Sequence, residues 1–99
     1  MAELLTADEI AAGLAGLPEW SGDASAIRRT VALPSFGSAI RAVDDVAAVA
    51  EEMDHHPDID IRWRTLTFAC ATHAMGGVTD LDLALARRID EVVARAAAD

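Results

Sequence analysis

The 99-residue sequence predicts an α+β fold with two layers, in which helices pack on one face of a four-stranded antiparallel sheet. Three stretches carry apolar residues at helical spacing, and two pairs of strand-like stretches are each joined by a short connection. Helices and hairpins follow one another in the order αββαββα. The composition, 53% hydrophobic and 25% charged, is typical of a folded chain, so we expect residues 1–99 to form a single domain.

The first helix is expected over about residues 7–16, because Thr6 and Glu9 have the spacing of a capping box. A turn then separates the segment around Trp20 from a strand-like stretch at residues 25–33. We expect these two segments to pair as a hairpin and the Trp20 ring to lie in the core.

A second helix is expected over residues 36–53. Pro57 limits this helix, because the residue before a proline is pushed out of the α region. Apolar residues recur at steps of three and four, which predicts one buried stripe. The stripe consists of Phe36, Ile40, Val43, Ala47 and Ala50.

The second hairpin is expected from a strand at residues 58–63 and a strand at residues 66–73, with residues 64–65 as the connection. Strict alternation in the first of them predicts a half-buried strand and favours a place for Trp63 in the core. After a loop, Thr79 is the expected N-cap of the last helix, with Asp82 at its third position.

Charge and composition exclude several classes of protein. The formal net charge of −9 repels phosphate backbones, which argues against direct binding of nucleic acid. No apolar run approaches the roughly 20 residues that span a bilayer, so no membrane partner is expected. The start of the chain lacks the basic region of a secretory signal, which predicts a cytoplasmic protein. Cys70, the single cysteine, is expected to be a buried thiol.

All three histidines lie between residues 55 and 73. His55 and His56 are at the exit of the second helix, and His73 is at the end of the last strand. Because a hairpin returns the chain close to its start, His73 should lie near the pair. Imidazole exchanges protons near neutral pH, so a convergence of three would form an acid–base site. The alternative is three unrelated surface histidines.

The spacing of these residues resembles the signature of the pterin-4a-carbinolamine dehydratases, and the resemblance covers essentially the whole chain. The signature runs through Glu51, His55-His56-Pro57, Trp63, His73 and Asp82, with similar residues at Thr72, at Gly76-Gly77-Val78-Thr79 and at Ala86-x-x-Ile89-Asp90. The resemblance implies dehydration of 4a-hydroxytetrahydropterin to quinonoid dihydropterin, which recycles the cofactor of aromatic amino-acid hydroxylases. It also implies a homodimer or homotetramer that needs no metal or other cofactor.

The resemblance assigns roles to the histidines. His55 and His73 would transfer protons, and His56 would hold the pterin substrate. Which of the first two is the acid stays open. The chain departs from many family members at Ala74, where they carry an acidic residue, and at Ile59, where they carry an aromatic one.

Four further residues are candidates for binding the substrate or orienting a histidine. Glu51 lies four residues before His55 and could orient its imidazole on a shared helix face. Asp54 could do the same or be solvated. Asp82 is either a functional carboxylate or only a helix cap, and Trp63 either flanks the pterin or belongs to the core.

Two other functions compete with the dehydratase. One is a non-enzymatic, dimerising interaction module of the same fold, since some animal members of the family also bind a transcription factor. The other is a metal-dependent hydrolase that uses the three histidines. It is disfavoured because adjacent residues in an extended segment point in opposite directions, which separates His55 from His56.

Overall fold

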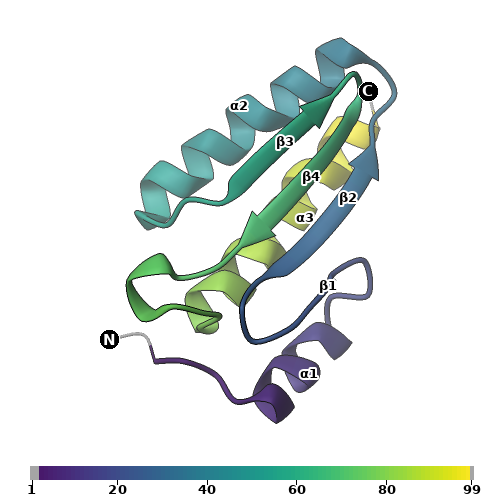
Figure 1. Cartoon of the computed structure of the whole chain (residues 1–99). Coiled ribbons are helices and arrows are strands. Elements are labelled where there is room, and N and C mark those ends of the chain that lie inside the picture. The colour runs from purple at the N-terminus through teal and green to yellow at the C-terminus, as the bar shows by residue number, and fades with distance from the viewer. Residues whose placement is uncertain (1–2, 99) are drawn as a thin grey trace.

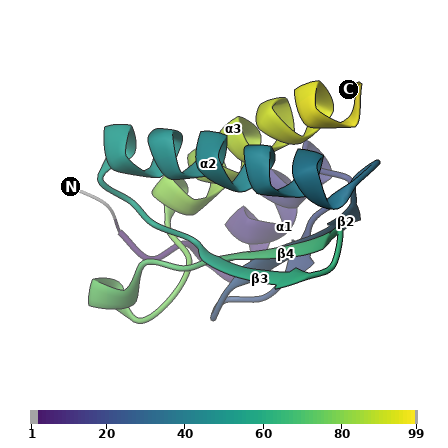
Figure 2. The ribbon, with the colours of Figure 1, turned by 90° about the horizontal axis from the view of Figure 1, so that it is seen from above.

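The computed structural model describes residues 3–98 and confirms the predicted architecture of a four-stranded antiparallel sheet with three helices (Figure 1). The strand order is β1-β2-β4-β3, and α2 and α3 form a layer over one face of the sheet (Figure 2). The elements are α1 (Ala7–Ala15), β1 (Ser21–Gly22), β2 (Ile27–Ala32), α2 (Phe36–Met53), β3 (Asp58–Arg62), β4 (Thr65–Cys70), the 3₁₀ turn η1 (His73–Met75) and α3 (Asp80–Ala97).

The two hairpins join through the pairing of β2 with β4, which runs from Ile27 opposite Cys70 to Ala32 opposite Thr65. β4 is therefore a central strand and β3 an edge strand. Alternate side chains of β4 are fully buried under the helices, because successive side chains of a strand point to opposite faces of the sheet. These are Leu66, Phe68 and Cys70.

The helix boundaries follow the predicted signals. The Thr6–Glu9 capping box is present at the start of α1, and α2 covers residues 36–53 as expected. Trp20 is buried, which confirms its assignment to the core. Its indole N–H donates to Asp90 Oδ1 at 2.7 Å, and Arg29 Nη1 donates to the same oxygen at 2.6 Å. This contact ties the N-terminal hairpin to α3.

The predicted buried stripe of α2 is correct at Ala50 but wrong in its rotation about the helix axis at the other four positions. Phe36 and Ala47 are exposed, and Ile40 and Val43 are only partly buried. The apolar residues of α2 cover two adjacent faces, so their spacing alone does not decide which face turns inward. Small side chains let packed elements approach closely. The face of α2 that carries Ala39 and Ala42 is the one in the core cluster shared with α3 and β4. The buried hydrophobic residues of α2 are Ala39, Ala42, Val46, Val49 and Ala50.

The second hairpin also differs from expectation at both ends. Its turn consists of Trp63 and Arg64 rather than residues 64–65, because Arg62 pairs with Thr65. Trp63 has a left-handed backbone (φ 53°) and its side chain is 71% exposed, so the core assignment is wrong. The turn breaks the alternation that would have pointed the ring inward. β4 ends at Cys70, and His73 begins η1 instead of ending the strand.

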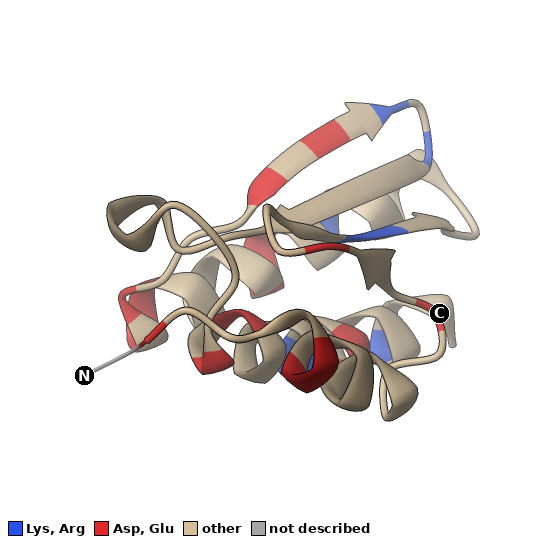
Figure 3. Cartoon of the chain, turned by 60° about the horizontal axis from the view of Figure 1, so that its bottom comes forward, with Lys and Arg blue, Asp and Glu red and all other residues tan. Residues whose placement is uncertain are grey.

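Acidic residues dominate the surface charge. Figure 3 shows acidic positions along β3 and on the helices, with basic positions at the turn that follows β3. No helix within residues 3–98 is both long enough and apolar enough to cross a membrane.

Cys70 should make the protein less stable at high pH. Burial, with smaller contributions from the charges of Asp82 and Asp58, raises the pKa of the Cys70 thiol from 9.0 to about 12. The unfolded chain loses this proton above about pH 9, whereas the folded chain keeps it up to about pH 12. The free energy of unfolding should therefore fall across this interval, by at most about 1.4 kcal/mol per pH unit.

Urea unfolding at several pH values tests this expectation cleanly, because the sequence contains no Lys or Tyr to titrate in the same interval. The Cys70→Ala variant should be less stable at neutral pH but should lack the alkaline slope. A slope of equal size in both proteins would contradict the assignment to Cys70.

Candidate active site

One pocket is lined by all three histidines. It lies at the end of the sheet where α2 stops and η1 begins, two chain segments that lie near each other in Figure 1. Its volume is about 360 Å³. The hairpin β3–β4 returns the chain to the exit of α2, as the sequence predicts, so His73 comes back to the adjacent pair. The lining residues are Asp54, His55, His56, Ala71, Thr72, His73, Ala74 and Leu81.

The end of α2 separates the two adjacent histidines. Asp54 adopts a left-handed conformation (φ 49°, ψ 44°), and the His55 N–H donates to the Ala50 carbonyl at 3.0 Å. This bond closes the last turn of the helix in the manner of a Schellman cap. The chain then leaves in an extended direction towards Pro57. His55 is consequently buried, at 9% exposure, while His56 remains exposed.

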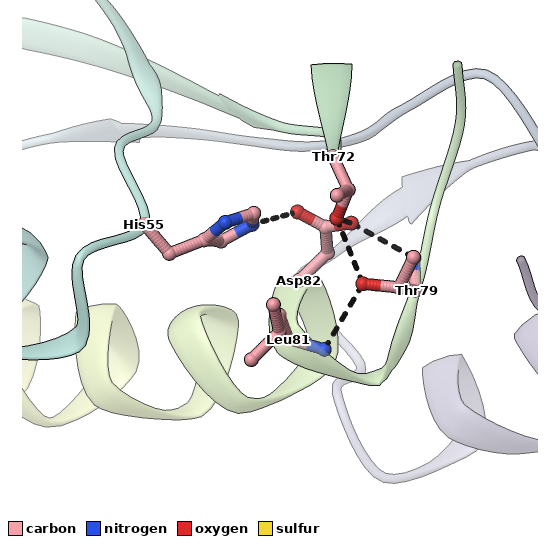
Figure 4. A network of polar contacts seen from close by, with 5 residues as sticks. All are labelled: His55, Thr72, Thr79, Leu81 and Asp82. Carbon is pink, nitrogen blue, oxygen red and sulfur yellow. Dashed lines mark hydrogen bonds and ion pairs between the residues drawn. The ribbon is translucent and has the colours of Figure 1, made fainter. Parts of the chain in front are cut away.

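His55 is bound to a fully buried carboxylate. Its Nε2 lies 2.6 Å from Asp82 Oδ1, and Asp82 is 0% exposed (Figure 4). The other oxygen, Oδ2, accepts the Thr72 hydroxyl and the Thr79 backbone N–H, each at 2.9 Å. Asp82 thus caps α3 as predicted and also holds His55. The two interpretations of this residue are compatible, because each oxygen of the carboxylate takes a different partner.

His56 pairs with Glu51 instead, with Nε2 and Oε2 2.5 Å apart at the surface. The i,i+4 spacing makes Glu51 a candidate for orienting His55. That expectation is wrong because the left-handed residue at 54 ends the helix before His55 can share a face with Glu51. Each of the two histidines therefore has its own carboxylate, one buried and one exposed.

The remaining candidates lie in different places. His73 is exposed on η1 beside Ala74, and Asp54 lies at the pocket edge. Gly76 ends η1 with φ 75°, which favours glycine. Trp63, at the β3–β4 turn, is at the other end of β3 and does not line the pocket. A role for Trp63 in substrate binding therefore stays a prediction.

Sequence reasoning did not assign a role to Thr72. The signal in the sequence was its place directly before His73. In the structure its hydroxyl oxygen lies 2.7 Å from that of Thr79. Within residues 3–98, no group of three or more His, Cys, Asp or Glu side chains is arranged to hold a metal ion.

Comparison with protein families decides the relationship. The family model described as pterin 4 alpha carbinolamine dehydratase matches residues 3–92, which include every residue that lines the pocket. The chain belongs to the pterin-4-alpha-carbinolamine dehydratase family.

Bacterial relatives of this dehydratase family member are similar over nearly their whole length. A protein of Mycobacteroides abscessus is 54% identical over 92 residues, which cover 93% of this chain and 98% of the relative. A protein of Nocardia farcinica is 53% identical over 90 residues, with coverage of 91% and 95%. Both carry the provisional name pterin-4-alpha-carbinolamine dehydratase.

Solved structures support the same fold. The crystal structure of a transcriptional coactivator/pterin dehydratase from Brucella melitensis superposes with a TM-score of 0.86 at 31% identity, covering 90% of this chain and 97% of that one. A pterin dehydratase-like protein identified as a RuBisCO assembly factor in the alpha-carboxysome gives a TM-score of 0.62 at 21% identity, covering 75% and 86%. The second likeness concerns the fold alone.

Proposed function

We propose that this member of the dehydratase family converts 4a-hydroxytetrahydropterin to quinonoid dihydropterin and water by histidine acid–base catalysis. The observation that carries the proposal is the set of three histidines around one pocket, one of them bound to a buried carboxylate. Membership of the family supports a pterin as the substrate class.

The reaction needs two proton transfers. The C4a–O bond breaks with its electron pair on the oxygen, which takes a proton from a general acid and leaves as water. A general base removes the proton from a ring N–H beside C4a, and the electron pair of that bond forms the new C=N bond. His55 and His73 supply the acid and the base, and His56 binds the pterin. A positioned proton transfer of this kind contributes about 10²–10⁴-fold to the rate.

Asp82 and Glu51 act through the histidines in this scheme. Asp82 holds His55 in one orientation and stabilises its cation when it carries a second proton. Glu51 does the same for His56 at the surface, where solvent screens the interaction.

A stopped-flow assay of the breakdown of 4a-hydroxytetrahydropterin tests the function. We expect the purified protein to accelerate the decay over the buffer rate in proportion to its concentration. The competing interaction module predicts a decay rate that does not change with protein concentration, and that result would reject the enzymatic proposal.

The protein should form a homodimer or homotetramer. β3 is an edge strand with unpaired backbone groups, and three large apolar side chains near it are exposed: Phe36 (52%), Ile61 (41%) and Trp63 (71%). The Leu33 N–H donates to the Arg64 carbonyl at 2.9 Å, which holds the start of α2 beside the β3–β4 turn. The start of α2, which is Phe36, and the β3–β4 turn, which holds Trp63, therefore lie at the same end of the molecule, as the ribbon in Figure 1 shows for these two elements.

Light scattering at micromolar concentration should give a mass of at least twice the 10.4 kDa of one chain. Ile61→Arg should lower that mass, because it places a charge on the exposed apolar surface, whereas Arg87→Glu on the exposed side of α3 serves as a charge-changing control. A wild-type protein that scatters as a monomer would contradict the expectation.

A further inference from the structure

We infer that Thr72 is a positioning residue: its hydroxyl holds the Asp82 carboxylate so that His55 keeps a proton on Nε2 and presents Nδ1 to the pocket. The catalytic consequence of this arrangement rests on the proposed function, but the arrangement itself can be measured without any activity.

The direction of every hydrogen bond in the network follows from its chemistry (Figure 4). A carboxylate only accepts hydrogen bonds, so the Thr72 hydroxyl donates its one proton to Asp82 Oδ2. In the 2.7 Å contact between the two threonines, Thr79 must then be the donor. The Thr79 oxygen in turn accepts the Leu81 backbone N–H at 3.2 Å. The chain of donors therefore runs one way, from the start of α3 to Asp82.

These hydrogen bonds occupy one of the two oxygens of the Asp82 carboxylate. Oδ2 receives both the Thr72 hydroxyl and the Thr79 backbone N–H, which leaves Oδ1 for the histidine. Since Oδ1 is also an acceptor, the His55 Nε2 in contact with it carries a proton. The neutral imidazole then has its lone pair on Nδ1.

The geometry also identifies where Nδ1 lies. His55 lines the pocket, and its hydrogen bond within the described part of the chain is made through Nε2. Within residues 3–98, Arg29 Nε is the one side-chain nitrogen or oxygen that is buried and has no hydrogen-bond partner. His55 Nδ1 has no partner either, so it is not buried and is open to the pocket. Nδ1 is therefore the atom that would exchange a proton with a bound pterin.

The arrangement has a chemical advantage for an acid–base residue. When Nδ1 gains a proton, the imidazolium forms directly beside the negative charge of Asp82. The two hydrogen bonds to Oδ2 fix the orientation of the carboxylate, so that Oδ1 stays in contact with the ring. Loss of the Thr72 hydroxyl would free the carboxylate to rotate and would leave the Thr79 hydroxyl without its acceptor. The proton on His55 would then be less firmly fixed.

Long-range ¹H–¹⁵N NMR of the histidine rings tests the tautomer directly in the wild-type protein. The signals are assigned with His56→Gln and His73→Gln variants. We expect neutral His55 to be protonated on Nε2, with its ring N–H protected from exchange with water. A His55 ring protonated on Nδ1 would overturn the inference, whether or not the protein dehydrates pterins.

Kinetics of Thr72 variants test the catalytic consequence. Thr72→Val keeps the shape of the side chain and removes the hydroxyl, so kcat should fall by about 10–100-fold, by analogy with the loss of an outer-shell partner of a metal-bound histidine. KM should change little, and faster exchange should broaden the Nε2–H signal. Thr72→Ser should restore both properties, because it returns the hydroxyl.

Thr67, on the strand that precedes Thr72, provides a matched control. Thr67 on β4 also contacts a second threonine hydroxyl, that of Thr30, at 2.9 Å, but on the exposed side of the sheet. Thr67→Val should leave kcat and the His55 spectrum unchanged.

A Thr72→Val protein with wild-type kcat and a wild-type His55 spectrum would overturn the inference. If Thr72→Val fails to fold, the wild-type spectrum still decides the tautomer. A wild-type protein without dehydratase activity but with the expected tautomer would reject the proposed function only.

Discussion

Replacement of His55 or His73 by Ala should lower the turnover number for pterin dehydration by about 10²–10⁴-fold, the usual contribution of a positioned acid or base. Both residues line the pocket. Each substitution removes an imidazole, the side-chain group that exchanges protons near neutral pH. His56→Ala should mainly raise KM. A residue that binds the substrate equally in the ground state and the transition state affects KM and leaves kcat unchanged.

Steady-state kinetics and thermal melting of the three variants check this expectation together. The melting temperatures of His56→Ala and His73→Ala should stay close to that of the wild type, because both side chains are exposed. His55→Ala should melt somewhat lower, since it leaves a buried carboxylate without one partner. Full turnover in both His55→Ala and His73→Ala, with folding intact, would end the enzymatic proposal and favour an interaction module.

Asp82→Asn should cause a second large loss of turnover while the protein still folds. The Thr79 backbone N–H requires an acceptor at the Oδ2 position, so the new amide places its oxygen there and its nitrogen towards His55. His55 Nε2 must then accept, which moves the ring proton to Nδ1 and removes the lone pair from the pocket. A wrong tautomer at a catalytic histidine can cost up to about 10⁴-fold in rate.

Asp82→Ala should separate the structural role of the residue from its chemical one. It leaves three donors without an acceptor in a site that is 0% exposed, so the free energy of unfolding should fall by about 3–5 kcal/mol. Asp80→Ala, at an exposed position in the first turn of the same helix, is the matched control and should cost under about 1 kcal/mol. Equal losses of stability in the two alanine variants would contradict a special role for the buried carboxylate.

The sequence by itself determined the order of elements and the place of the histidines. Capping boxes and proline are local signals, which depend on neighbours within a few residues, so the starts of α1 and α3 and the end of α2 could be predicted. The apolar setting of Cys70 is equally local, and the burial that it predicted for this thiol on β4 is observed. A hairpin must return the chain to its origin, and this brought His73 back to the exit of α2.

Only the tertiary structure decided the face of α2 that packs inward and the partner of each carboxylate. Apolar residues on two sides of α2 satisfy the same spacing, and the choice depends on the close packing that Ala39 and Ala42 allow. Glu51 reaches His56 rather than His55 because of a single left-handed residue, Asp54. The bond from Asp82 to His55 joins residues 27 positions apart on separate elements, and no local pattern encodes such a contact.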